Sequence, residues 1–177
     1  MNFQYAQIIS TSIRQIERLT HTLGKSTAWL LLLMALIETV IVVLRYGFNE
    51  GSIALQESVT YLHATIFLLG AAYTLSEDGH VRVDIIYRNA SARFQSWINL
   101  LGSVFFLLPF AIFLFWISLP YVTQSWTIME ASADAGGIPG VFILKTLIPI
   151  FCSLLFLQGL AEALKAVQTI LRGTSEA

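Results

Sequence analysis

The sequence predicts an all-α integral membrane protein with four transmembrane helices. Hydrophobic residues make up 56% of the 177 residues, and charged residues make up only 12%, about half the share of a typical soluble domain. Four apolar segments also reach the length of roughly 20 residues that a helix needs to cross a bilayer. These segments cover residues 27–48, 55–75, 97–121 and 141–164, and residues 1–177 form a single membrane domain.

The four segments are expected to be helices because each is an unbroken apolar run. The strands of a membrane barrel would instead alternate apolar and polar residues. Backbone groups in lipid must find their hydrogen-bond partners within the segment, which a helix provides. The single cysteine, Cys152, lies inside the fourth segment, cannot form an internal disulfide, and is interpreted as a small packing residue.

Basic residues are distributed unevenly between the two sides of the predicted membrane domain. Positive charge follows the cytoplasmic side of membrane proteins, so we expect both termini and the connection between the second and third spans to be cytoplasmic. The net charge of −1 argues against a nucleic-acid partner. The predicted cytoplasmic basic residues are Arg14, Arg18, Lys25, Arg82, Arg88, Arg93, Lys165 and Arg172, whereas the opposite side has Arg45 and Lys145.

Three segments outside the spans have their own predicted structure. Residues 3–23 are expected to form an amphipathic helix, with Ile9, Ile13 and Ile16 near one face, that lies in the inner headgroup region. The alternative is a cytoplasmic extension of the first transmembrane helix. Residues 84–94 mix apolar and basic residues and predict a short interfacial helix. Residues 127–139 are expected to form an acidic, flexible external loop.

A few polar side chains are candidates for a site. Glu38 is the deepest charge, near the middle of the first span, and such a carboxylate is a functional candidate by default. It could carry protons, but a bond to a neighbouring helix is favoured because no second intramembrane charge accompanies it. Two ion pairs are also expected at the outer ends of the spans. These pairs are Arg45 with Glu57, and Glu130 with Lys145.

Cofactor, metal and catalytic chemistry find no support in the residue pattern. His63 is the one histidine well inside a span, and bis-histidine haem ligation needs a second on a facing helix. No cluster of His, Cys and carboxylates has metal-ligand spacing, and no serine or cysteine has a base nearby. We therefore expect no enzyme activity, no cofactor and no metal. Pro109 and Pro149 are expected to kink their helices. Close contact between helices is expected at small residues, namely 70–72, Gly159 and Ala163.

Short motifs run in order along most of the chain, and the block GHVRVD at residues 79–84 is the most specific of them. In these motifs the chain resembles the small, DctQ-type membrane subunit of tripartite ATP-independent periplasmic (TRAP) transporters. It departs from the usual family pattern at 54–55 and 141–142, where the family often has a tryptophan. The other matching positions are RYGFN at 45–49, QE at 56–57, GAAY at 70–73, Ser125, Glu130, Ser132, Pro139, Lys145, IP at 148–149 and Gln158.

The resemblance implies a multi-pass protein of the bacterial inner membrane that pairs with a large membrane subunit. In the family, the large subunit holds the substrate and sodium sites, and a periplasmic binding protein delivers the substrate. The small subunit would scaffold this sodium symport of organic acids. Phospholipids would be further partners. The residues expected to contact partner or lipid are His80, Arg82, Asp84, Arg88, Arg45, Glu57, Glu130 and Lys145.

Two other function classes remain open on the sequence. Small proton-coupled multidrug exporters also have four helices and a key glutamate in the first, which Glu38 resembles. They are shorter than this chain and have tight loops. A membrane anchor of a redox enzyme is the other class, and the placement of the histidines argues against it.

Overall fold

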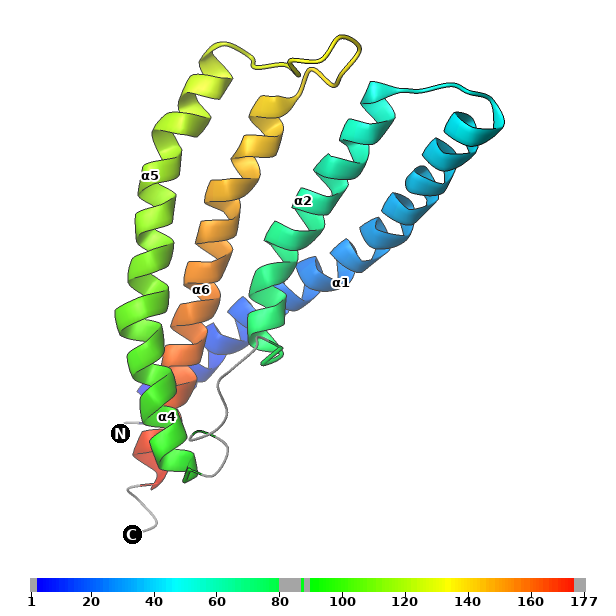
Figure 1. The fold of residues 1–177 in the computed structure, drawn as a ribbon. Coiled ribbons are helices and arrows are strands. Elements are labelled where there is room, and N and C mark those ends of the chain that lie inside the picture. Colours follow the sequence, from blue (N-terminus) through cyan, green and yellow to red (C-terminus); the bar gives the residue numbers. More distant parts are fainter. Residues whose placement is uncertain (1–2, 80–86, 88–89, 174–177) are drawn as a thin grey trace.

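The computed structural model describes residues 3–79, 87 and 90–173 and shows a bundle of long helices (Figure 1). No strand occurs among these residues, and four helical segments within them are long and apolar enough to cross a membrane. The all-α, four-span prediction is therefore confirmed. The elements are α1 (Phe3–Gly47), α2 (Ile53–Ser76), α4 (Ala92–Gly102), the π-helical turn η1 (Ser103–Leu107), α5 (Leu108–Thr127) and α6 (Val141–Gly173).

Helix α1 is continuous over 45 residues. At 1.5 Å per residue its length is about 68 Å, more than twice the thickness of a bilayer's hydrocarbon core. The expected separate helix at 3–23 is thus an extension of the first transmembrane helix, which was the alternative. The chain has no proline between the two parts, and Gly24 packs directly against the ring of Tyr73. This contact offsets the cost of about 1 kcal/mol that a glycine imposes on a helix.

A tight connection makes α1 and α2 antiparallel neighbours. Asn49 has a left-handed backbone, with φ 56°, and the next N–H, of Glu50, donates to the carbonyl of Leu44 at 3.0 Å. This arrangement ends α1 in the manner of a helix C-cap. Ser52 then caps α2, because its hydroxyl accepts from the N–H of Leu55 at 3.4 Å.

The third span is one helical rod, 92–127, that contains a widened turn. The π-helical turn η1 ends just before Leu108, and Pro109 occupies the first turn of α5. A proline removes one N–H donor from a helix, and here it directly follows the π-turn, where the hydrogen-bond spacing of the rod changes. The rod begins at the Ser91 cap. Of the interfacial helix expected at 84–94, residues 84–86 and 88–89 lie outside the described residues, and residues 92–94 belong to the start of α4.

Helix α6 is the centre of the bundle, because it contacts α1, α2, α4 and α5. The start of α1, the end of α6 and α4 lie together at one end of the bundle, which we call the terminal end (Figure 1). The opposite end, the loop end, carries the α1–α2 connection (48–52) and the α5–α6 loop (128–140). Figure 1 shows α1 crossing α6 near the terminal end and diverging from it toward the loop end.

Candidate functional site

At the loop end, a carboxylate on α2 holds the α5–α6 loop. Glu57 accepts hydrogen bonds from the Ser132 hydroxyl and, at 2.5 Å, from the backbone N–H of Ile138. Gly137 lies so close that an added Cβ would come within 2.4 Å of Ser132 Oγ and 2.7 Å of Glu57 Oε1. We call Glu57, Ser132, Gly137 and Ile138 the loop anchor. It joins the α1–α2 hairpin to the α5–α6 hairpin.

The expected Glu57–Arg45 ion pair is wrong. Arg45 is exposed on α1, and the Glu57 carboxylate is instead engaged by the α5–α6 loop. Sequence proximity across the short α1–α2 connection suggested the pair. The rotation of the two helices about their axes decided against it.

The expected pair of Glu130 and Lys145 is present in the structure. Lys145 Nζ donates to Glu130 Oε2 at 2.5 Å and lies 3.9 Å from the centre of the Tyr121 ring. The hydrogen bond from Lys145 lowers the pKa of the Glu130 carboxyl below its ordinary 4.5. Nearby, Trp126 donates to the Thr146 hydroxyl at 2.9 Å. These contacts tie the end of α5 to the start of α6.

At the terminal end, a chain of polar side chains joins α1 to α6. Gln158 is fully buried; its Oε1 accepts from the Thr20 hydroxyl at 3.1 Å and its amide donates to Glu162 at 2.9 Å. Lys165 bridges Glu162, at 2.9 Å, and Glu17, at 2.6 Å. We call Thr20, Gln158, Glu162, Lys165 and Glu17 the terminal cluster. A buried polar group is stabilising only when it is hydrogen-bonded, and each member of this cluster is.

Sequence reasoning did not identify Gln158 as a structural centre, although it matched the family pattern. A signal was available, since a glutamine inside the apolar segment 141–164 needs a partner. The identity of that partner was not readable, because Thr20 lies 138 residues away. A second tie at the same end is the pair of His21 and Glu77, 3.3 Å apart, which joins α1 to the end of α2.

Glu38 has a different environment from these carboxylates. It is exposed on α1, and no hydrogen bond or ion pair joins it to the rest of the described chain. The neighbouring Thr39 satisfies its own hydroxyl on the Ala35 carbonyl at 2.8 Å. The favoured interpretation, a bond to a neighbouring helix, therefore has no counterpart within the described helices of this chain.

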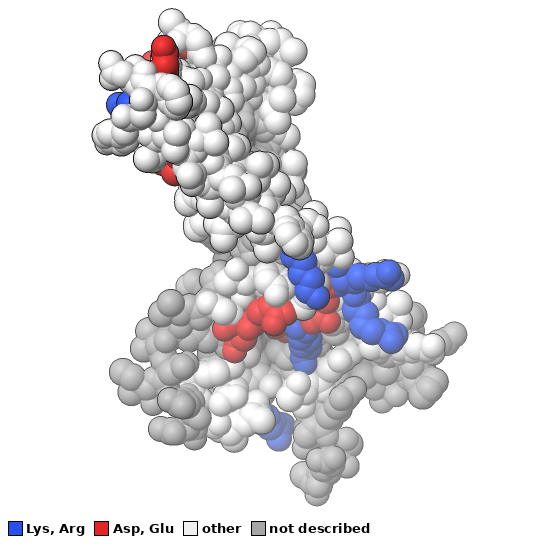
Figure 2. Space-filling model, turned by 90° about the vertical axis from the view of Figure 1, so that its right-hand side faces the viewer, with Lys and Arg blue, Asp and Glu red and all other residues white. Residues whose placement is uncertain are grey.

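Charged residues gather mainly at the two ends of the molecule, with the larger group near one end, and leave the surface between them largely uncharged (Figure 2). This distribution is typical of a protein that spans a bilayer.

A family model described as "Tripartite ATP-independent periplasmic transporters, DctQ component" matches residues 22–169. The chain belongs to the DctQ family. It is therefore a membrane component of a TRAP transporter, the small permease subunit, and works with the large membrane subunit and the binding protein.

No curated protein and no solved structure matches this DctQ chain. The family match covers both the loop anchor and the Glu130–Lys145 pair, together with most of the terminal cluster. Of the positions expected to contact a partner, four lie outside the described residues. These are His80, Arg82, Asp84 and Arg88.

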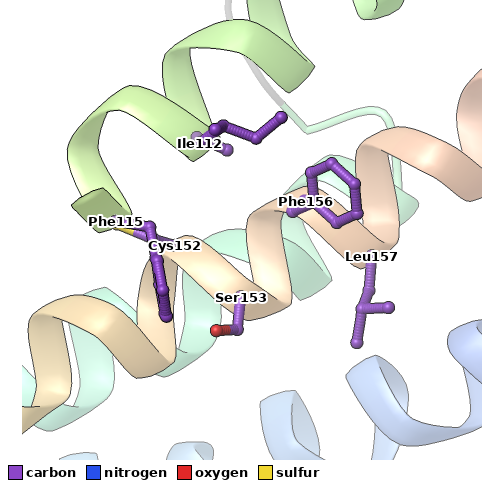
Figure 3. A pocket seen from close by; sticks show the side chains of 7 residues that line it. Ile112, Phe115, Cys152, Ser153, Phe156 and Leu157 are labelled. Carbon is purple, nitrogen blue, oxygen red and sulfur yellow. The ribbon is translucent and has the colours of Figure 1, made fainter.

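An apolar groove of about 340 Å³ lies between α5 and α6 of the DctQ chain (Figure 3). The hydroxyl of Ser153, on its α6 side, already donates to the Pro149 carbonyl at 2.8 Å. Cys152 is fully buried beside it, in keeping with a packing role. The groove therefore offers shape and apolar surface but no free polar group. Its lining is Ala111, Ile112, Phe115, Cys152, Ser153, Phe156 and Leu157.

Groups of three or more potential metal ligands do not occur within the described residues. His63 is exposed on α2. Of the glycines expected to allow close helix contact, Gly159 does so, because an added Cβ would lie 2.8 Å from Leu107 Cδ2. A Cβ on Gly70 would meet only Thr27 Oγ1, at 3.9 Å, whereas a Cβ on Gly24 would lie 2.3 Å from Tyr73 Cγ. Gly24, which the sequence did not single out, is the tighter helix contact.

Proposed function

We propose that this DctQ chain is a scaffold that holds the large membrane subunit in the bilayer during sodium-driven uptake of carboxylate substrates. The proposal rests on one observation: the polar side chains at both ends of the bundle are bonded to other parts of this same chain. The loop anchor and the terminal cluster bind helices of this chain to one another, as a rigid support requires.

The proposed orientation follows the basic residues. The terminal end carries Arg14, Arg18, Lys25 and Lys165, so it would face the cytoplasm of a bacterial inner membrane. The α5–α6 loop would then face the periplasm. With Glu57 fixing its position and Asp134 exposed, this loop would contact the binding protein as it docks.

The orientation can be tested by labelling. The native Cys152 is fully buried, so a cysteine in place of the exposed Asp134 gives a distinct reactive site. A membrane-impermeant maleimide should label Asp134→Cys in intact cells, and a cysteine at exposed Arg18 only after the membrane is opened. The reverse pattern would contradict the orientation.

The transport role can be tested by reconstitution. Proteoliposomes with the large subunit, this chain and the binding protein should take up a carboxylate substrate when a sodium gradient is imposed. Omitting this chain should abolish uptake. Uptake that is unaffected by its omission would contradict the scaffold role, and drug export by this chain alone would favour the exporter class instead.

The motif at 79–84 is proposed to contact the large subunit or lipid phosphates from the cytoplasmic side. Replacing Arg82 by alanine should reduce recovery of the large subunit more than replacing Arg172, because both are basic but only Arg82 belongs to the motif. Equal recovery and equal uptake would argue against this role.

A further inference from the structure

Glu38 lies close to the middle of the membrane-spanning part of α1. At 1.5 Å per residue it is about 13.5 Å along the helix axis from both Trp29 and Gly47. The hydrocarbon core of a bilayer is about 30 Å thick. The carboxylate of Glu38 therefore cannot reach either water interface from this depth.

The face of α1 that packs on α2 is defined by a regular row of residues. Gly24 and Thr27 lie against Tyr73 and Gly70 of α2. The half-buried positions of α1 continue this row with alternating steps of three and four residues, which is the spacing of a packed helix seam. These positions are Leu30, Met34, Ile37, Ile41 and Leu44.

Glu38 lies outside this row, on the exposed side of α1. Between residues 28 and 47 no residue of α1 is buried, and all positions outside the row are exposed. Ala35, Glu38, Val42 and Arg45 follow one another along this side at helical spacing. We call these four residues the Glu38 stripe. A chain alone in lipid would present an unpaired carboxyl group to hydrocarbon along this stripe.

Three other polar or charged side chains of the bundle find their partners within this chain. Gln158 has Thr20 and Glu162, Glu57 has the α5–α6 loop, and Lys165 has two carboxylates. Polar groups at membrane depth face a protein partner or a water-filled cavity. Because the described part of this chain supplies no partner for Glu38, we look for the complementary group on another chain.

Resting on the proposed function, we propose that the Glu38 stripe is the membrane-embedded contact with the large subunit. A transmembrane helix of that subunit lies along the stripe and donates a hydrogen bond to Glu38 near the bilayer midplane, from a hydroxyl, an amide or a cationic side chain. A second copy of this chain fits less well. Two-fold symmetry would place two carboxyl groups opposite each other, and both are acceptors when ionised.

The first test is co-purification of the tagged chain with the untagged large subunit. Glu38→Leu should lower the recovered large subunit about tenfold, since it removes a hydrogen bond to a charged group. Glu38→Gln keeps an acceptor oxygen and should retain most of the recovery. Leu36→Gln, a change at an exposed position off the stripe, is a control for polarity in the span.

The second test places a photo-crosslinking residue at Ala35, Glu38 or Val42, with Ile117, exposed on α5, as the control position. Stripe positions should give adducts with the large subunit and Ile117 should not. Adducts with a second copy of this chain, or unchanged recovery of Glu38→Leu with no adduct, would overturn the proposal. Failure of the wild-type chain to recover the large subunit would instead contradict the proposed function.

Discussion

The terminal end and the loop end of the bundle are held together in different ways. At the terminal end the α1 backbone at Gly24 packs directly against the Tyr73 side chain of α2, and Thr20 is buried against Gln158 of α6. At the loop end the two hairpins are joined by the loop anchor, in which a carboxylate binds a loop. Among the α1 residues whose burial the structure describes, the buried ones (Ile13, Thr20, Gly24 and Thr27) all lie at or before residue 27, toward the terminal end.

This difference teaches where the stability of the bundle resides. The hydrophobic effect contributes little to helix association in lipid. Close packing of small residues and interhelical hydrogen bonds must therefore hold the helices together. The terminal end has both, and we expect changes there to affect the whole fold. The loop end has polar ties at its surface, and we expect changes there to act locally.

The largest effect is expected for Gly24→Ala. The new Cβ would lie 2.3 Å from Tyr73 Cγ and 2.5 Å from Tyr73 Cβ, so α1 and α2 must separate. Such overpacking costs about 1–3 kcal/mol. Thermal unfolding in detergent micelles measures the loss. Gly70→Ala is the matched control, because its Cβ would meet only Thr27 Oγ1 at 3.9 Å, and equal losses for both variants would break the comparison.

A smaller loss is expected for Gln158→Leu, which removes the buried link between Thr20 and Glu162. Hydrogen bonds between membrane helices contribute about 0.6–2 kcal/mol. The double variant Thr20→Val/Gln158→Leu should lose less stability than the two single variants lose together, because both changes remove the same hydrogen bond. Gln124→Leu, at an exposed position of α5, should leave the unfolding temperature nearly unchanged.

Removing the loop anchor should have a local effect. In Glu57→Ala, the Ser132 hydroxyl and the Ile138 N–H lose their acceptor. Hydrogen exchange at Ile138 should accelerate, while the unfolding temperature changes less than in Gly24→Ala. Glu50→Ala, at an exposed position of the α1–α2 connection, should change neither quantity. A global loss of stability in Glu57→Ala would show that the loop end also carries the fold.

The smallest effect on stability is expected when the pH is lowered. The pKa of Glu130 in the folded chain is lowered below 4.5 by Lys145, so its contribution is present above the unfolded pKa and is lost as pH falls through the folded pKa. The wild type should therefore lose more stability than Glu130→Gln between neutral pH and pH values below 4.5. Thermal unfolding across this range measures the difference, and parallel curves would refute the assignment.

Features that depend on short stretches of the chain could be predicted from residue patterns. The length of the apolar segments predicted the four spans, and the motifs predicted the family. Glu130 and Lys145 were paired correctly because they lie on either side of the α5–α6 loop, where α5 ends and α6 begins. The same reasoning failed for Arg45 and Glu57, which are even nearer in the sequence, because Glu57 binds the α5–α6 loop while Arg45 is exposed on α1.

The sequence by itself determined the helical class, the number of spans and the membership of the DctQ family, because hydrophobicity and motifs are properties of contiguous residues. Only the tertiary structure decided that α1 is a single helix, that Gly24 meets Tyr73, and that Gln158 binds Thr20. These features depend on how far each helix is rotated about its axis and where it crosses its neighbours. The same rotation leaves Glu38 on the exposed side of α1, without a partner in the described chain.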